Sequence, residues 1–436
     1  MSVTLLRGRT LSFRDIPCSH TDEASYIYEE DGAVAIKDGL IAASGSYLQV
    51  RERFPDADII DHRPNLILPG FIDTHLHFPQ GQVIGSFGTK LLDWLNTYTF
   101  VEEQKFADPG HCKRMAGHFF DNLLRNGTTT AVAYCSVHKA SADAFFAEAG
   151  RRNLRMIGGK VMMDRNAPDA LCDTPQSAYD DSKQLIADWH GRGRALYAIS
   201  PRFAITSTPT QLEMAQALKA DHPECYLQTH LSENHAEIKL TLELYQSARD
   251  YLDVYEMYGL LGDRSLFGHC LHLGDRERAA MAETGSVAVF CPTSNLFLGS
   301  GLFDEDGLRA QGVRTAIATD IGGGTSYSML KTLDEAYKVL QLRNQVLNPL
   351  KSFCMMTLGN ARALQLEHQI GTLEQGSEAD IIVINPHATP AMALRMETVR
   401  SLAEELFVLQ TMADDRAIAA VYAAGRACHP ERDLDL

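Results

Sequence analysis

Apolar runs alternate with amphipathic stretches through the middle of the chain. Each short, β-rich run is followed by a segment with helical spacing, which is typical of a parallel sheet covered by helices. We expect eight strands near 66–77, 128–134, 156–163, 196–203, 225–232, 266–273, 287–292 and 315–320. Amphipathic helices are expected at 111–125, 209–220 and 328–343. Eight strands over about 250 residues predict a (β/α)8 TIM barrel, an α/β fold.

The two ends of the chain show a different pattern. Short β-rich runs separated by turns occur at 32–36 and again at 379–385 and 419–422. Two β-rich ends around a different middle predict one small domain built from both termini. We therefore expect a β-sandwich domain from residues 1–65 plus 373–436, and the barrel from residues 66–372.

Composition narrows the class of partner. The 436 residues carry a formal net charge of −16, and an acidic chain is not attracted to nucleic-acid phosphates or anionic lipids. We therefore expect a small-molecule substrate, with neither a nucleic acid nor a membrane as partner. Nine cysteines show no C-x-x-C spacing. The first forty residues lack a signal-peptide pattern, and no apolar stretch could span a bilayer, so we expect a cytoplasmic protein.

Polar residues stand where several apolar runs end, and these positions build the active sites of barrels of this type. The first run ends His75-Leu76-His77, and residues two apart on a strand share a face. Four strand ends supply potential metal ligands or acid–base groups: His75 with His77, His230 with Glu233, His269, and Asp320. Agreement among four strand ends indicates a metal site more strongly than any one of them alone.

Ligand chemistry divides these groups into roles. Three neutral imidazoles and one carboxylate suit zinc, iron or manganese and leave a position for water, made acidic by the metal. The predicted ligands are His75, His77, His230 and Asp320. Glu233 could then move protons between water and substrate, while His269 orients the nucleophile or hydrogen-bonds the substrate. We predict catalytic roles for Glu233, His269 and Asp320, the last as a ligand that also faces the nucleophile.

These residues, in this order and spacing, resemble the amidohydrolase superfamily, in the branch that holds one metal and deaminates heterocycles. The segment 371–381 resembles that superfamily's return to its β domain, so the resemblance covers essentially the whole chain. Within the branch, four segments are similar to guanine deaminases: 73–80, 91–100, 200–203 and 229–234. The resemblance implies one Zn²⁺ per chain, a homodimer, a purine substrate, and hydrolysis of guanine to xanthine and ammonia.

A purine edge needs fixed donors and acceptors, and two residues offer them. Gln80 offers both through its amide, and Arg202 offers a rigid donor fork suited to a carbonyl oxygen. Phe203 could pack on the ring or contact it through its backbone, and His269 completes the predicted substrate contacts. Structural alternatives are an ion pair for Arg202 and a loop position for Gln80. Trp94 and Tyr98, four residues apart, either fill a core or form a lid.

Other functions compete with this interpretation. The same metal chemistry would serve a pterin, an oxidised guanine, a triazine or an adenine-type base. Two-metal hydrolases of the hydantoinase type usually carry a bridging carboxylated lysine at the fourth strand, where this sequence has Arg202, and Lys160 in the third run is expected to be structural. A non-catalytic scaffold would have lost ligands, whereas all the expected ligands and Glu233 are present.

Overall fold

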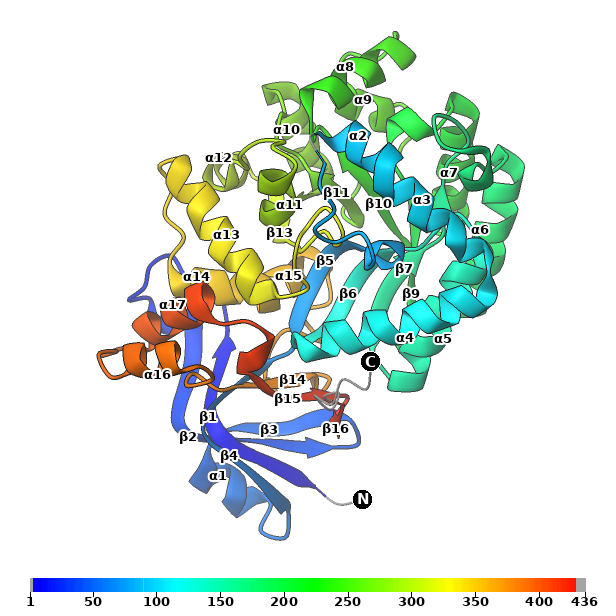
Figure 1. Ribbon diagram of the computed structural model, residues 1–436. Helices are drawn as coiled ribbons and strands as arrows, with labels where there is room; N and C mark the ends of the chain where they lie inside the picture. The colour runs from blue at the N-terminus through cyan, green and yellow to red at the C-terminus, as the bar shows by residue number, and fades with distance from the viewer. Residues whose placement is uncertain (1–2, 89, 429–436) are drawn as a thin grey trace.

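Eight parallel strands form the larger sheet of the computed structural model, which describes residues 3–88 and 90–428. In chain order they are β5 (Phe71–His77), β6 (Thr128–Tyr134), β7 (Arg155–Gly159), β9 (Leu196–Pro201), β10 (Tyr226–Leu231), β11 (Ser265–His269), β12 (Val287–Phe290) and β13 (Arg314–Ile317). Each pairs in parallel with the next, and the short β8 (Val161–Met162) adds to β9. Figure 1 shows helices surrounding these strands.

The first and last strands meet just beyond the end of β13. The Asp320 amide donates to the His75 carbonyl at 2.9 Å, and the His77 amide donates to the Ile321 carbonyl at 2.5 Å. Nearer the base, the Asn360 side chain donates to the carbonyls of Ile72 and Ile317. The sheet is therefore a nearly closed barrel, which confirms the predicted (β/α)8 fold.

Several barrel helices begin at a capping side chain. The barrel helices are α4 (Pro109–Arg125), α5 (Lys139–Arg152), α6 (Pro175–Trp189), α7 (Pro209–Asp221), α8 (His235–Leu244), α9 (Tyr251–Glu256), α10 (Asp275–Thr284), α11 (Pro292–Phe297), α12 (Glu305–Ala310), α13 (Met329–Leu342), α14 (Pro349–Cys354) and α15 (Asn360–Ala363). Side chains of Asp108, Thr208 and Ser328 cap α4, α7 and α13, the three predicted helices. Within the described ranges, no helix combines the length and hydropathy needed to cross a bilayer.

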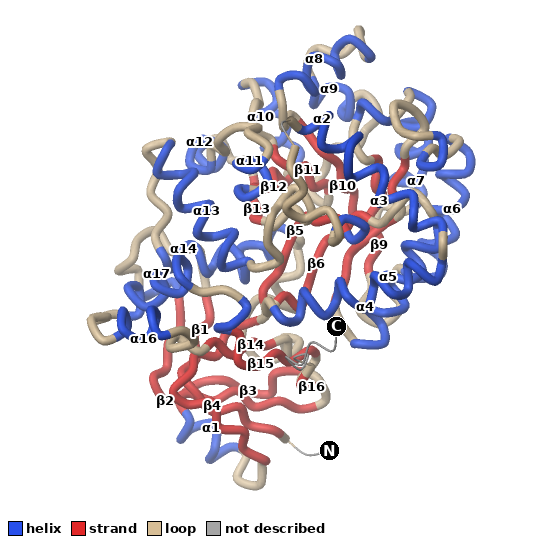
Figure 2. The backbone as a smooth tube through the Cα atoms, in the orientation of Figure 1, coloured by secondary structure: helices blue, strands red, loops and turns tan. Residues whose placement is uncertain are grey.

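Strands from both ends of the chain form a second, separate sheet at the bottom of Figures 1 and 2. They are β1 (Thr4–Phe13), β2 (Tyr26–Lys37), β3 (Leu40–Ser46), β4 (Asp58–Pro69), β14 (Ile381–Ile384), β15 (Ile418–Ala423) and β16 (Arg426–Ala427). The order is β16-β15-β14-β4-β1-β2-β3, and only β1 and β4 pair in parallel. This mixed sheet confirms a small β domain that both termini build.

Three further helices accompany this sheet. The helix α1 (Tyr47–Arg53) packs on β2 and β3, whereas α16 (Pro390–Met396) and α17 (Leu402–Met412) interrupt the C-terminal strands. The helix α17 packs against α13 and α14 of the barrel, and its Glu405 accepts two hydrogen bonds of 2.6 Å from Arg9 of β1. This helical pair was not foreseen in the β-rich C-terminal segment, and it joins the sheet to the barrel.

The expected first barrel run, 66–77, divides at Gly70. Residues 66–69 pair with β14 in the end sheet, and the barrel strand β5 begins at Phe71. A Cβ atom at Gly70 would lie 2.1 Å from Thr129 Oγ1, so a side chain cannot fit where the chain passes between the sheets. The chain therefore enters the barrel directly from the end sheet, while the limits of the two domains stay predictions.

A buried charge cluster joins the base of the barrel to the end sheet. Arg194 donates to Glu378 at 3.0 Å and to Asp380 at 3.0 Å, and Arg155 donates to Glu378 at 2.8 Å. The side chains of all four residues are at most 16% exposed. We call these four residues the base cluster.

Candidate active site

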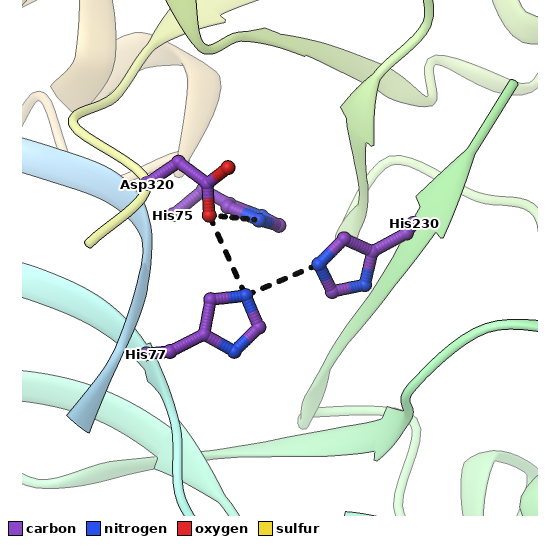
Figure 3. Close-up of side chains that lie close together, drawn as sticks. All are labelled: His75, His77, His230 and Asp320. Carbon is purple, nitrogen blue, oxygen red and sulfur yellow. Dashed lines mark hydrogen bonds and ion pairs between the residues drawn. The ribbon is translucent and has the colours of Figure 1, made fainter. Parts of the chain in front are cut away.

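The predicted ligand set comes together at the carboxyl end of the barrel. His75 and His77 end β5, His230 lies in β10, and Asp320 follows β13 (Figure 3). One ligand atom from each of the four lies within 4.8 Å of all the others. The alternation of β5 therefore turns both of its histidines inward, as the H-x-H spacing predicts.

The distances within this set are short enough for all four residues to bind one divalent ion. His77 Nε2 lies 3.1 Å from His230 Nε2, and Asp320 Oδ1 lies 3.4 Å from His75 Nε2 and 3.5 Å from His77 Nε2. Donors about 2.0–2.1 Å from a tetrahedral Zn²⁺ lie roughly 3.3 Å apart. His75 Nε2 is buried and has no hydrogen-bond partner among the described residues. The donor set and this orphaned nitrogen both fit a divalent metal.

Neighbouring groups hold the imidazoles in the ligand form. His230 Nδ1 donates to the Arg202 carbonyl at 2.6 Å, which leaves the lone pair of Nε2 directed into the site. Tyr134, at the end of β6, stacks on His77 with ring centroids 4.7 Å apart. Burial lowers the pKa of His77 and His230 well below the usual value, so both rings are neutral near pH 7.

The three predicted acid–base residues lie together beside the ligands. Glu233 Oε2 lies 3.4 Å from His269 Nε2, and Asp320 Oδ2 lies 3.8 Å from the same nitrogen. Ser300 Oγ donates to Glu233 Oε1 at 2.9 Å, and Asn295 Nδ2 lies 2.9 Å from His269 Nδ1. With Asn295 donating, the proton of His269 is on Nε2, where it faces both carboxylates.

Burial separates the pKa values of these groups. Burial, helped by the charges of Glu237 and Asp320, raises the pKa of Glu233 well above its usual value. Burial lowers the pKa of His269 to about 4. Although burial alone would raise the pKa of Asp320, the neighbouring histidines, His75 first, lower it to about 2. The arrangement offers an anionic carboxylate at Asp320, a neutral imidazole at His269, and a carboxyl at Glu233 whose affinity for a proton is raised.

A cavity of about 410 Å³ opens beside the ligands. Its wall contains every predicted substrate contact: Gln80, Arg202, Phe203 and His269. Gln80 lies in the short helix η2 (Phe78–Gln80) that follows β5, and Arg202 and Phe203 follow β9. The lining combines apolar walls with a few convergent polar groups, as the sites of small molecules do.

The roof of the cavity comes from the segment 91–103, which contains α2 (Leu91–Trp94), the π-helical η3 (Leu95–Thr99) and α3 (Phe100–Glu103). Leu91, Trp94 and Leu95 line the cavity. Trp94 Nε1 is buried without a hydrogen-bond partner among the described residues, whereas Tyr98 is half-buried and outside the lining. Of the two aromatic residues considered for a lid, only Trp94 borders the cavity.

A residue that the sequence analysis missed connects this roof to the substrate contacts. Glu103 accepts hydrogen bonds from Gln80 Nε2 at 2.9 Å and from Arg202 Nη1 at 2.7 and 2.9 Å. Arg202 therefore forms an ion pair, the structural role that was the alternative to substrate binding, and it also lines the cavity. No local pattern marks Glu103, because it lies 99 residues from Arg202 in the chain.

Four residues around this site have a strained backbone. Ser232, His269, Cys270 and Asp320 have φ values of 49°, 72°, 52° and 52°, a region that residues with side chains rarely adopt. All four lie at or just beyond the carboxyl ends of barrel strands. Such conformations persist where the surrounding structure holds them, and here they aim two functional side chains, His269 and Asp320, into the site.

Comparison with known proteins supports the same centre. The sequence model of the amidohydrolase family matches residues 66–428. The chain belongs to the amidohydrolase family. It is 48% identical to the guanine deaminase of Escherichia coli K12 over 398 residues, which are 91% of each chain.

Solved structures of family members agree with this fold. The structure of E. coli guanine deaminase covers 99% of this chain and 100% of its own, with a TM-score of 0.96 and 45% identity. Guanine deaminase from C. acetobutylicum, solved with guanine bound in its active site, covers 98% of this chain and 100% of its own, with a TM-score of 0.88 and 27% identity. The similarity therefore extends over both domains of the fold.

Proposed function

We propose that this protein hydrolyses guanine to xanthine and ammonia with the help of one bound Zn²⁺. A single observation carries the proposal: one cavity is bordered by three members of the ligand set, by Glu233 and by the Arg202–Gln80 pair. The similarity to guanine deaminases over 91% of the chain supports guanine as the base. Removing the amino group of a free base assigns the reaction to purine catabolism.

The metal role follows from the donor set. Three imidazoles and one carboxylate suit zinc, and the hydrogen bond from His230 to the Arg202 carbonyl orients one of the imidazoles. When bound, the ion would supply a water acidic enough to attack near neutral pH. Metal analysis of the purified protein should give about one zinc per chain.

Arg202 and Gln80 would hold the base. Arg202 donates to the carbonyl oxygen of guanine, and the amide of Gln80 exchanges hydrogen bonds with a neighbouring ring position. Phe203 and Trp94 supply apolar contact with the two faces or edges of the ring. The carbon bearing the amino group then faces Glu233 and His269.

Proton movement completes the reaction. Glu233 accepts a proton from the attacking water and delivers it to the ring nitrogen next to the amino-bearing carbon. The water oxygen bonds to that carbon, with His269 Nε2 donating to this oxygen. Asp320 Oδ2 accepts the second water proton and passes it to the amino group, and the carbon–nitrogen bond breaks. Guanine and water thereby become xanthine and ammonia.

The test is ammonia release from zinc-loaded protein given guanine, with the purine product identified by chromatography. Ammonia and xanthine in equal amounts are expected, with loss after chelation and recovery after zinc is restored. A pterin, 8-oxoguanine, a triazine and adenine are assayed at matched concentration. If the protein deaminates one of these compounds but not guanine, that compound replaces guanine as the proposed substrate, and the proposed reaction stands. The homodimer stays a prediction, which light scattering of the pure protein tests.

A further inference from the structure

Glu103 is the centre of a hydrogen-bonded unit that the reaction itself does not use. Its side chain is 1% exposed and Arg202 is 3% exposed, so both charges are held away from water. Glu103 Oε1 accepts from both Gln80 and Arg202, and the amide oxygen of Gln80 accepts from the Gly322 backbone at 3.0 Å. The two residues proposed to hold the base are therefore oriented by one carboxylate.

The same carboxylate cancels a buried positive charge. A desolvated guanidinium without a counter-ion strongly attracts any anion, because the surrounding dielectric is low. Paired with Glu103, Arg202 still presents N–H donors to the cavity but adds no net charge to it. Such a unit can donate hydrogen bonds to a neutral carbonyl, but it does not attract an anionic ligand by its charge.

We infer that Glu103 is a specificity-determining residue: by orienting Arg202 and Gln80 and cancelling the charge of Arg202, it makes the cavity select an uncharged oxopurine over an anionic one. This inference rests on the proposed function for the identity of the base. Xanthine is a stronger acid than guanine and is partly anionic near neutral pH. The pairing therefore favours departure of the product as well as entry of the substrate.

Glu103 also belongs to the roof segment, so it joins base recognition to closure of the cavity. It ends α3, and Phe100 of the same short helix lies under Arg202, with the guanidinium carbon 5.5 Å from the ring centroid. Trp94 and Leu95 of the preceding turns line the cavity. A purely structural role for Glu103 would thus weaken all ligands together, whereas a role in charge selection would weaken one class and strengthen another.

The experiment measures binding of two purines that carry no amino group and so cannot be deaminated. Hypoxanthine is an uncharged oxopurine, and urate is an anion at neutral pH. Calorimetric titrations use zinc-loaded wild-type protein, Glu103→Gln and Glu103→Asp. The matched control is Glu102→Gln, which removes the same charge from the adjacent, more exposed residue that pairs with Lys105.

In Glu103→Gln, hypoxanthine should bind about tenfold more weakly and urate about tenfold more tightly, as expected when a charge-assisted contact is lost or gained. Glu102→Gln should change neither by more than about twofold. Glu103→Asp keeps the charge, so its preference for hypoxanthine over urate should remain even if both bind more weakly. Urate that binds Glu103→Gln no more tightly than wild type would overturn the inference.

The outcomes also separate this inference from the proposed function. Xanthine production from guanine, together with an unchanged urate affinity in Glu103→Gln, would contradict the inference alone. If Glu103→Gln shifts binding from hypoxanthine toward urate as expected, but the wild-type protein releases no ammonia from guanine, only the proposed function is contradicted. If Glu103→Gln does not fold, Glu103→Asp is the test. This variant keeps the negative charge, so a shift of its binding preference toward urate would contradict the inference that the charge sets the preference.

Discussion

The two ends of the barrel bury polar groups in opposite ways. At the base, Arg194 and Arg155 meet Glu378 and Asp380 in a cluster where each charge has an opposite partner. At the mouth, four buried polar atoms have no partner among the described residues: His75 Nε2, His77 Nδ1, Trp94 Nε1 and Tyr134 Oη. Unpartnered buried atoms also occur elsewhere in the described chain, but here one of them, His75 Nε2, belongs to the candidate ligand set, which indicates a site that a ligand completes.

Positive φ values at residues other than glycine occur near both ends, with Asn153 and Ala424 beside the base cluster, but at the mouth they include candidate site residues. Ser232, His269, Cys270 and Asp320 adopt positive φ values at the mouth, at a cost of about 1–3 kcal/mol each. The base cluster joins the barrel to the end sheet by hydrogen bonds from its two arginines to its two carboxylates. The base is therefore built for stability and the mouth for chemistry, so substitutions at the two ends should affect different measurements.

The largest expected effect is on turnover, at the mouth. Glu233→Gln keeps the volume and the contact with Ser300 but cannot carry a proton. The rate of guanine deamination should fall by about 10³–10⁴-fold while zinc content and the unfolding midpoint stay near those of wild type. The control is Glu243→Gln, an exposed position on α8. Wild-type turnover in a zinc-loaded Glu233→Gln protein would show that another group moves the proton.

At the base, the expected effect is on stability instead. Arg194→Ala leaves the carboxylates of Glu378 and Asp380 short of a counter-charge, and should lower the free energy of unfolding by about 3–5 kcal/mol. The turnover number of the protein that remains folded should change by less than about twofold. Arg192→Ala, at an exposed neighbour, is the control. Urea unfolding and assays run on the same samples; a large loss of turnover without destabilisation would contradict the division between the two ends.

A smaller effect is expected where the mouth holds the base. Arg202→Ala removes a donor to the carbonyl oxygen and leaves Glu103 without its ion pair. The kcat/KM for guanine should fall by about 10–100-fold, with zinc content unchanged. Unchanged guanine kinetics combined with loss of metal would mean that Arg202 supports the ligands, through its carbonyl contact with His230, and does not hold the base.

The smallest expected effect is a difference between the two ends in how their stability depends on pH. Burial raises the pKa of Glu237, near the mouth, to about 7, so its contribution to stability is lost as the pH rises from the unfolded value through 7. Burial alone would raise the pKa of Glu378 at the base too, but Arg155 and Arg194 outweigh it and lower this pKa. The stability that Glu378 contributes is therefore lost as the pH falls.

Urea unfolding between pH 5 and 7 measures this difference. Wild type should lose about 2 kcal/mol over this range through Glu237, and Glu237→Gln should lack that component. Glu243→Gln, on the same helix, should retain the wild-type slope. An identical slope in wild type and Glu237→Gln would mean that another group causes the pH dependence.

Local pattern was sufficient for the barrel and for bringing the candidate ligands to its mouth, but not for Glu103. The strand ends at His77, His230 and His269 could be read directly, because period-two alternation places side chains and barrel geometry places strand ends. The division of the run 66–77 was missed because both halves are apolar and extended. The Pro69-Gly70 pair, at whose glycine a side chain would meet Thr129, was the local sign of the break.

Sequence by itself determined the order of the strands, the inward face of each, and the donor types at their ends, because these depend on neighbours along the chain. Tertiary structure decided how distant charges are paired. Glu103 meets Arg202 across 99 residues, and Arg194 meets Glu378 across 184. No periodicity encodes such pairs, since a buried charge accepts any counter-charge that the packed fold brings within reach.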